Sequence, residues 1–278
     1  MKYFFTLPLA LVLFIVSCGK NKYDNSSAPR LNAMIENYFS EFSSMSDQAI
    51  TGSMVFYKVG KVITNNLEDN EPFQVSKIDC NVIITLDTTG VNKTITIDWG
   101  TTNCTCNDGK SRRGKLISTF TGSYFTQGTV ITHTPLDYFV NDNKVEGTAS
   151  VTNMGLNPSM QPYYNVNIEG IVTMSTGEEI NYNSTRIRTF TNGFTTPEFF
   201  LDDEYSVTLT SNATVTNGDN YEAHTNEALK LKLGCGYVKS GILSITPSGK
   251  AERVIDYGDG ACDATFTIAI NGNTYVIN

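Results

Sequence analysis

The sequence predicts an all-β protein, an antiparallel meander forming a sandwich or open barrel, with one short N-terminal helix. Apolar and polar residues alternate over most of the chain beyond Thr51, turn sequences separate the alternating segments, and a helical repeat is confined to the region before them. Because one face of each segment is polar, the sheets should be packed on one side and hydrated on the other. A sandwich or barrel is favoured because many strands in one flat sheet would leave too much apolar surface uncovered.

Composition limits the class of protein further. The chain has 278 residues and a formal net charge of -8, from 20 Lys and Arg against 28 Asp and Glu. A nucleic-acid partner is not expected, since its recognition needs a basic surface. Hydrophobic residues make up 40% of the chain, which is enough for a sizeable core. We therefore expect one large or two small domains.

The N-terminal residues have the pattern of a lipoprotein signal. A basic start precedes an apolar run from Tyr3 to Val16, which is shorter than the roughly 20 residues that span a bilayer. The motif Ile15-Val16-Ser17-Cys18 resembles the lipobox of bacterial lipoproteins, and an ordinary signal peptide that happens to contain a cysteine is the alternative. The resemblance implies a signal peptide over residues 1–17 and a lipid anchor at Cys18. The residues that follow are polar and without apolar periodicity, which predicts a flexible tether over 18–30 before a β body over 31–278.

The β body begins with the helical segment. Residues 31–50 have apolar side chains three and four positions apart, which predicts one amphipathic helix. Strands are predicted over 145–151 and, on both sides of a turn at 175–177, within 164–182. A long hairpin is predicted between Tyr205 and Leu233, with the turn at Asn217–Asn220.

Two segments of the body repeat one pattern. Each has a cysteine, a strand, a turn, a second strand ending in Ile-Asp-aromatic-Gly, and a second cysteine after three further residues. The first copy contains Ile97-Asp98-Trp99-Gly100 within residues 80–104, and the second contains Ile255-Asp256-Tyr257-Gly258 within 235–262. The two cysteines of each copy should lie close together, because one opens a strand and the other follows the end of its antiparallel partner.

This geometry predicts the disulfides Cys80–Cys104 and Cys235–Cys262. The envelope location implied by the lipobox agrees with them, since disulfides persist in oxidising compartments. Cys106 is then the odd cysteine, although Cys80 could pair with Cys106 instead of Cys104.

A family resemblance rests on these motifs together. The lipobox, the two Ile-Asp-aromatic-Gly motifs, the segment Asn143-Lys144-Val145-Glu146-Gly147-Thr148 and the hairpin cysteines resemble a group of uncharacterised outer-membrane lipoproteins of Bacteroidetes bacteria. The resemblance covers most of the mature chain and implies an envelope location, but no activity and no site residues. The Cys104-Thr105-Cys106 doublet departs from the single loop cysteine of that group.

The residues after Cys18 bear on which side of the outer membrane the body faces. Surface-exported lipoproteins of Bacteroidetes resemble one another in an acidic cluster just after the lipidated cysteine. Here Gly19-Lys20-Asn21-Lys22-Tyr23 precedes a single acid, Asp24, so the periplasmic face is favoured over the cell surface.

No catalytic motif is present in the sequence. There is no Gly-x-Ser-x-Gly elbow and no His-Glu-x-x-His zinc motif, and Gly109-Lys110-Ser111 has Cys104 where a phosphate loop needs its first glycine. The two histidines, His133 and His224, are expected to be solvated or hydrogen-bonded at the surface.

Three charged or aromatic groups are candidate binding sites. Weak calcium candidates are Asp256, Asp259 and Asp263, but Asp98 and Asp256 fit better as acceptors for amides of the turns that follow them. A basic group is expected to lie in a solvated loop; it comprises Lys110, Arg112, Arg113 and Lys115. Aromatic residues that either line a glycan-binding face or pack in the core, the commoner case, are Tyr57, Trp99, Tyr163 and Tyr164.

The sequence therefore favours an envelope-anchored lipoprotein whose rigid β scaffold binds a protein or glycan partner, without a cofactor. The alternatives are an envelope carbohydrate-active enzyme and a surface adhesin or filament subunit. Two carboxyl groups about 5 to 9 Å apart in a cleft would favour the enzyme.

Overall fold

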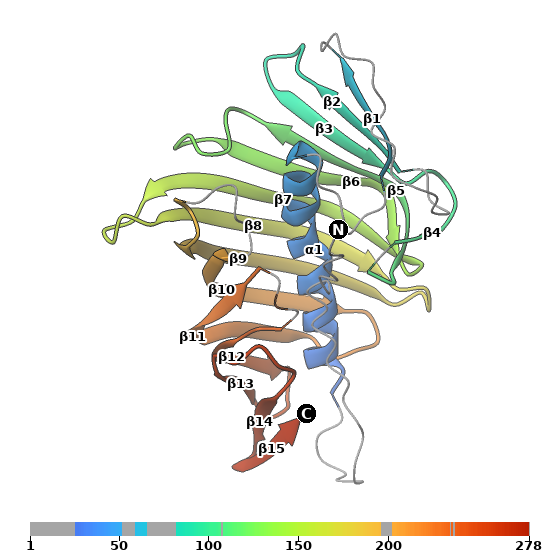
Figure 1. Ribbon diagram of the computed structural model, residues 1–278. Helices are drawn as coiled ribbons and strands as arrows, with labels where there is room; N and C mark the ends of the chain where they lie inside the picture. Colours follow the sequence, from blue (N-terminus) through green and yellow to red (C-terminus); the bar gives the residue numbers. More distant parts are fainter. Residues whose placement is uncertain are drawn as a thin grey trace, which may run out of the picture. The chain divides into compact units, whose positions relative to one another are not determined.

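The computed structural model describes residues 26–51, 59–65, 82–106, 108–195, 202–233, 235 and 237–277. Over these residues the chain forms one helix and a mostly antiparallel meander whose strands are hydrogen-bonded in chain order (Figure 1). The sheet is open and not closed into a barrel. The prediction of an all-β antiparallel meander with an N-terminal helix is confirmed.

The chain divides into two compact units. Unit 1 comprises Met1–Asn37, Met154–Val166 and Tyr182–Asn278, and unit 2 comprises Tyr38–Asn153 and Asn167–Asn181. Helix α1 and strands β7, β8 and β9 contribute residues to both units.

Most of the first eight strands belong to unit 2. Strand β1 pairs parallel with β2, whereas the pairs from β2 to β7 are antiparallel, with the two-residue β4 beside β5. The bounds are β1 Val59–Asn65, β2 Val82–Asp87, β3 Lys93–Asp98, β4 Cys104–Thr105, β5 Ser111–Phe120, β6 Val130–Val140, β7 Asn143–Leu156 and β8 Pro162–Thr173.

The remaining strands belong mainly to unit 1. The predicted long hairpin is formed by β10 and β11, which pair from Glu204↔Lys232 to Ala213↔Tyr221. Asn217, in its turn, has a φ of 61°, which asparagine tolerates better than most residues. The bounds are β9 Glu179–Asn192, β10 Glu204–Val215, β11 Tyr221–Lys232, β12 Ser240–Pro247, β13 Arg253–Asp259, β14 Phe266–Ile270 and β15 Asn273–Ile277.

Helix α1, Ala28–Thr51, is longer than the helix predicted over 31–50. It begins inside the predicted tether, where the Ser26 hydroxyl accepts a hydrogen bond from the Ala28 amide at 3.2 Å. This bond satisfies one of the amides that a helix leaves unpaired at its first turn.

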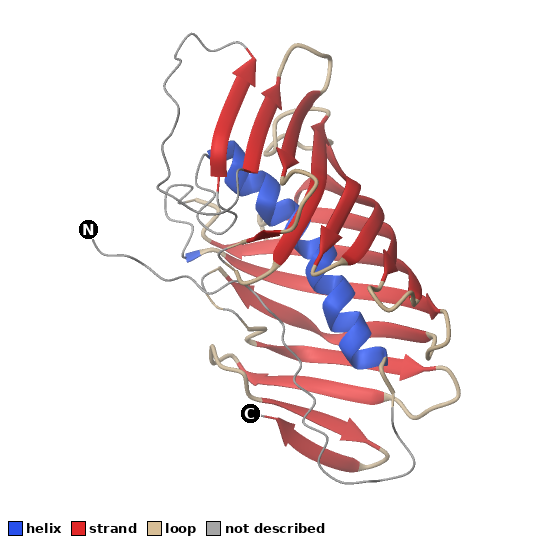
Figure 2. Ribbon diagram, turned by 90° about the vertical axis from the view of Figure 1, so that its right-hand side faces the viewer, coloured by secondary structure: helices blue, strands red, loops and turns tan. Residues whose placement is uncertain are grey.

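In unit 2, the helix covers the apolar face of the strands (Figure 2). Phe39, Phe42 and Met45 are buried, and the Phe42 ring packs edge-on against Tyr138 with centroids 5.8 Å apart. Gly170 of β8 lies directly under the Phe39 ring, where any larger residue would clash. The apolar cover expected from a second sheet is therefore supplied by a helix, and all the strands that the structure describes belong to one sheet.

Several predictions fall on residues outside this description. The signal peptide 1–17, the lipidation site Cys18, most of the tether and the predicted disulfide partner Cys80 lie outside the described residues. Among the residues that are described, no helix has the length and hydropathy needed to cross a bilayer.

Candidate functional site

The face of unit 1 opposite helix α1 carries a polar groove of about 380 Å³ across β9, β10 and β11. Its lining comes from the first half of β9, the second half of β10 and the start of β11: Asn183, Ser184, Thr185, Thr210, Ser211, Asn212, Glu222, Ala223 and His224. We call this set the polar groove.

Strand register places its side chains in two rows. Asn212 pairs with Glu222 across the β10–β11 ladder, and the Asn183 amide of β9 donates to the Asn212 amide oxygen at 3.5 Å. The second row contains the pair Thr210↔His224. Alternate residues of a strand point to the same face of the sheet, so the two rows lie on one face. The side chains of both rows are exposed to solvent.

The opposite face of these strands packs against the first part of α1. Arg186 of β9 is buried, and its Nη2 lies 2.7 Å from Glu36 Oε2, while the Tyr182 hydroxyl donates to the same carboxylate. On β10 the buried Ser211 hydroxyl lies 3.5 Å from the Asn32 side-chain oxygen. These contacts hold β9 and β10 against α1 on the face opposite the polar groove.

The polar groove has the chemistry of a binding surface. Asn183 and Asn212 offer amide donors and acceptors, Glu222 offers carboxylate acceptors, and His224 offers ring nitrogens. Glu222 is the one carboxylate among the lining residues. His224 is exposed on the polar face, where the sequence placed it.

His133 is buried, with 1% of its surface exposed, so the prediction that it lies at the surface is wrong. Its Nδ1 lies 2.8 Å from the Ser118 hydroxyl and 3.3 Å from the Ser46 hydroxyl, and its Nε2 lies 3.3 Å from the Ser43 hydroxyl. Such bonds offset the cost of burying an imidazole. The available signal was the two-residue spacing from Ile131, which places His133 on the buried face of β6.

The basic group around Arg112 is also not a solvated loop. Arg112 is fully buried on β5; its guanidinium binds both oxygens of Asp108, at 2.8 and 2.5 Å, and Glu41 of α1 at 2.8 Å. Lys110 donates to the same Glu41 carboxylate. We call these four residues the buried ion cluster. Two positive and two negative groups balance, as buried charges require.

Unlike the buried Arg112, Arg113 and Lys115 have side chains that are partly exposed to solvent. The Arg113 guanidinium lies 3.7 Å from the centroid of the Phe139 ring and 2.6 Å from Asp142, and Lys115 pairs with Asp98 at 2.9 Å.

The weak metal candidates serve as turn acceptors. Asp256, Asp259 and Asp263 accept hydrogen bonds from the amides of Gly258, Ala261 and Thr265, each two residues ahead, and Asp98 does the same for Gly100. The described residues contain no group of three or more His, Cys, Asp or Glu arranged to hold a metal ion.

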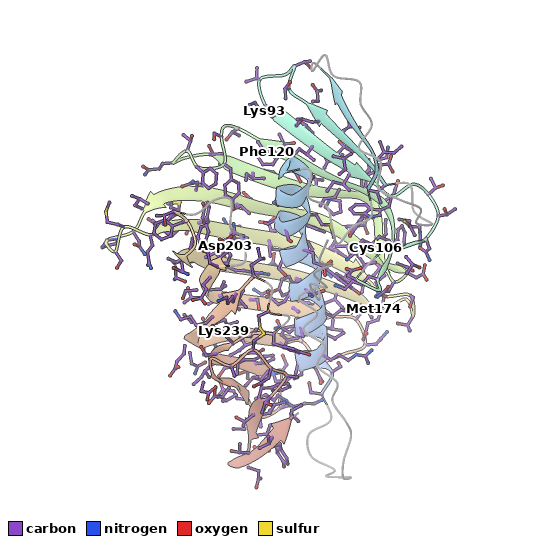
Figure 3. All side chains as sticks on the ribbon, viewed as in Figure 1. Lys93, Cys106, Phe120, Met174, Asp203 and Lys239 are labelled. Carbon is purple, nitrogen blue, oxygen red and sulfur yellow. A yellow bond between two sulfur atoms is a disulfide. The ribbon has the colours of Figure 1, made fainter. Side chains whose placement is uncertain are left out.

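The second copy of the repeat contains the disulfide that it predicts. Cys235 and Cys262 form the disulfide that the second copy predicts, 27 residues apart in sequence. Cys104 is also disulfide-bonded; it follows the end of β3 and lies on the two-residue β4 beside β5. Cys106 is a free, buried cysteine, and burial raises the pKa of its thiol (Figure 3).

Asp203, just before β10, is an unusual carboxyl group. Burial raises its pKa to about 6, although the Tyr205 hydroxyl donates to it at 3.3 Å (Figure 3). Its neighbour Gly193 has a φ of 93° and leaves no room for a Cβ beside the Asp203 side chain. No sequence motif marks Asp203.

The three aromatic candidates that the structure describes do not form an exposed face. Trp99 and Tyr164 are buried, with 4% and 1% of their surfaces exposed, and Tyr163 is half-buried. Tyr57 lies outside the described residues. No protein family, curated protein or solved structure matches the chain.

Proposed function

We propose that the protein is an envelope lipoprotein, anchored through Cys18, whose β scaffold binds a neutral glycan in the polar groove. The observation that supports it most directly is the combination of amide, hydroxyl, carboxylate and imidazole groups on one exposed surface of adjacent strands. Sugar hydroxyls both donate and accept hydrogen bonds, and Asn side chains do the same from fixed positions.

The packing behind the groove favours a binding role. Strands β9 and β10 are held against α1 by buried contacts from Tyr182, Arg186 and Ser211. A ligand then meets side chains whose backbone is already ordered, which lowers the entropic cost of binding.

A glycan-cleaving enzyme is less well supported by this surface. Most glycosidases place two carboxyl groups about 5 to 9 Å apart around the scissile bond. The polar groove has Glu222 as its one carboxylate.

An array of immobilised neutral oligosaccharides tests the proposal. The full chain should bind members of the array, and Asn212→Ala should weaken binding about tenfold, as the loss of one hydrogen bond to the ligand does. Asn226→Ala, an exposed residue of β11 outside the groove, is the matched control and should bind as the unaltered chain does. Binding that survives Asn212→Ala and Glu222→Gln, or no binding to any member, would refute the glycan assignment.

The anchor and its location have their own tests. The lipobox predicts that Cys18→Ser leaves an uncleaved precursor that incorporates no labelled fatty acid. Normal maturation of that variant would contradict the assignment. The single acid after Cys18 favours the periplasmic face, so protease added to intact cells should spare the body. Efficient digestion there would instead favour a surface adhesin.

A further inference from the structure

Strand β15 is an edge of the sheet. It pairs antiparallel with β14 from Phe266↔Ile277 to Ile270↔Asn273, and β14 is its one ladder partner in the part of the chain that the structure describes (Figure 1). An edge strand presents backbone amides and carbonyls that are ready to pair with another strand.

The turn before β15 determines which backbone groups face outward. Asn271 and Gly272 have φ angles of 52° and 75°, as in a two-residue type I′ hairpin. In such a hairpin the flanking pair, Ile270↔Asn273, is a hydrogen-bonded pair, and such pairs alternate along the ladder. Tyr275 therefore bonds to β14, whereas the amides and carbonyls of Thr274 and Val276 point away from it.

This edge lacks the usual protection against association. Residues 264–277 contain no charged side chain and no proline, in a chain whose net charge is -8. Tyr275 is 46% exposed and Val276 is 62% exposed.

We propose that β15 pairs antiparallel with β15 of a second copy of this chain, about a two-fold axis at Tyr275. The outward residues Thr274 and Val276 are symmetric about Tyr275, so each pairs with the other residue of the second copy and exchanges both backbone hydrogen bonds. Tyr275 then faces Tyr275 of the second copy in a non-hydrogen-bonded pair, where aromatic side chains pack well.

The choice of a second copy follows from the geometry of the edge. The net charge of -8 opposes association of two copies, but residues 264–277 are uncharged, so contact at this edge adds no local repulsion. The outward amides and carbonyls of this edge match those of a second, antiparallel copy of the same edge. A two-fold interface requires a surface that is complementary to itself in this way.

Disulfide capture tests both the contact and its register. Tyr275→Cys places the two cysteines about 4.5 Å apart between Cα atoms, within disulfide range, so mild oxidation of the full chain in detergent should give a covalent dimer. Thr274→Cys is the matched control, because its two cysteines are offset by two residues and lie about 8 Å apart, beyond that range. Equal cross-linking of both variants, or none with Tyr275→Cys, would overturn the proposed pairing.

A second variant measures association without a new cysteine. Val276→Pro removes one outward amide from each copy and leaves the β14 ladder intact, because that amide does not bond to β14. Sedimentation of the full chain in detergent should show dimers that dissociate at least tenfold more readily in this variant, while Val276→Thr behaves as the unaltered chain. A monomer at every concentration, or an unchanged dimer with Val276→Pro, would overturn the proposal.

Discussion

The buried ion cluster predicts a large loss of stability when one of its charges is removed. Arg112 is fully buried, and the Asp108 side chain is 1% exposed and binds its guanidinium in a bidentate pair. Asp108→Asn keeps the size of the side chain but removes its charge. Arg112 and Lys110 would then face the single carboxylate of Glu41.

The magnitude follows from the burial of the pair. Removing one partner of a buried ion pair leaves an uncompensated charge in a region of low dielectric and costs about 3–5 kcal/mol. A domain of this size loses roughly 2–4 °C of melting temperature per kcal/mol, so the expected fall is roughly 6–20 °C.

The one tryptophan of the chain provides the assay. Trp99 is 4% exposed and its ring centroid lies 5.3 Å from that of Tyr138, in the same unit as Arg112. Its fluorescence during heating therefore reports the unfolding of unit 2. Glu146→Gln is the control, because its pair with Lys144 is 2.7 Å long but solvent-exposed, and exposed pairs contribute little. An Asp108→Asn chain as stable as this control would refute the electrostatic reasoning.

Three further predictions concern packing, the disulfide and pH. Replacing Cys235 and Cys262 together by serine should cost about 3.5 kcal/mol for the 27-residue loop, measured by urea unfolding against the unaltered chain; no loss would contradict the chain-entropy account. Gly170→Ala should cost about 1–3 kcal/mol, because the new methyl group overlaps the Phe39 ring, and an unchanged urea midpoint would show that the helix moves freely. The raised pKa of Asp203, about 6 against 3.8, means that the folded chain holds this proton more tightly, so stability falls as pH rises through that range. Asp203→Asn should therefore melt higher than the unaltered chain at pH 7.5 and lose this advantage below pH 4; the same difference at both pH values would contradict it.

Local patterns were enough to predict the meander and its turns. The β10–β11 hairpin follows from alternation on both sides of Asn217, and the Cys235–Cys262 disulfide follows from the spacing of a strand pair. The Asp98 and Asp256 acceptors are equally local, because each bonds to an amide two residues ahead. Such features need no knowledge of distant parts of the chain.

The buried polar groups could not be predicted in this way. Arg112 binds Glu41, and His133 contacts Ser46. Both partners lie on α1, far away in sequence. Alternation alone places Arg112 on the same face of β5 as Leu116 and Phe120, but a basic residue on that face is credible only once its acids are located.

The alternation of apolar and polar residues predicted that one face of the sheet is buried, but it did not predict that a helix covers this face. A helix with Phe39 and Phe42 on its buried side supplies the apolar surface that a second sheet would have supplied, and Gly170 provides the room for it. Alternation shows that one face of a strand is buried, but a helix and a sheet bury it equally well. The sheet stays open, with β15 as its last strand, and the polar side of β9–β11 is exposed to solvent. The edge proposed for pairing and the face proposed for binding thus use different surfaces of unit 1, so a dimer formed through β15 would leave the polar groove of each copy available.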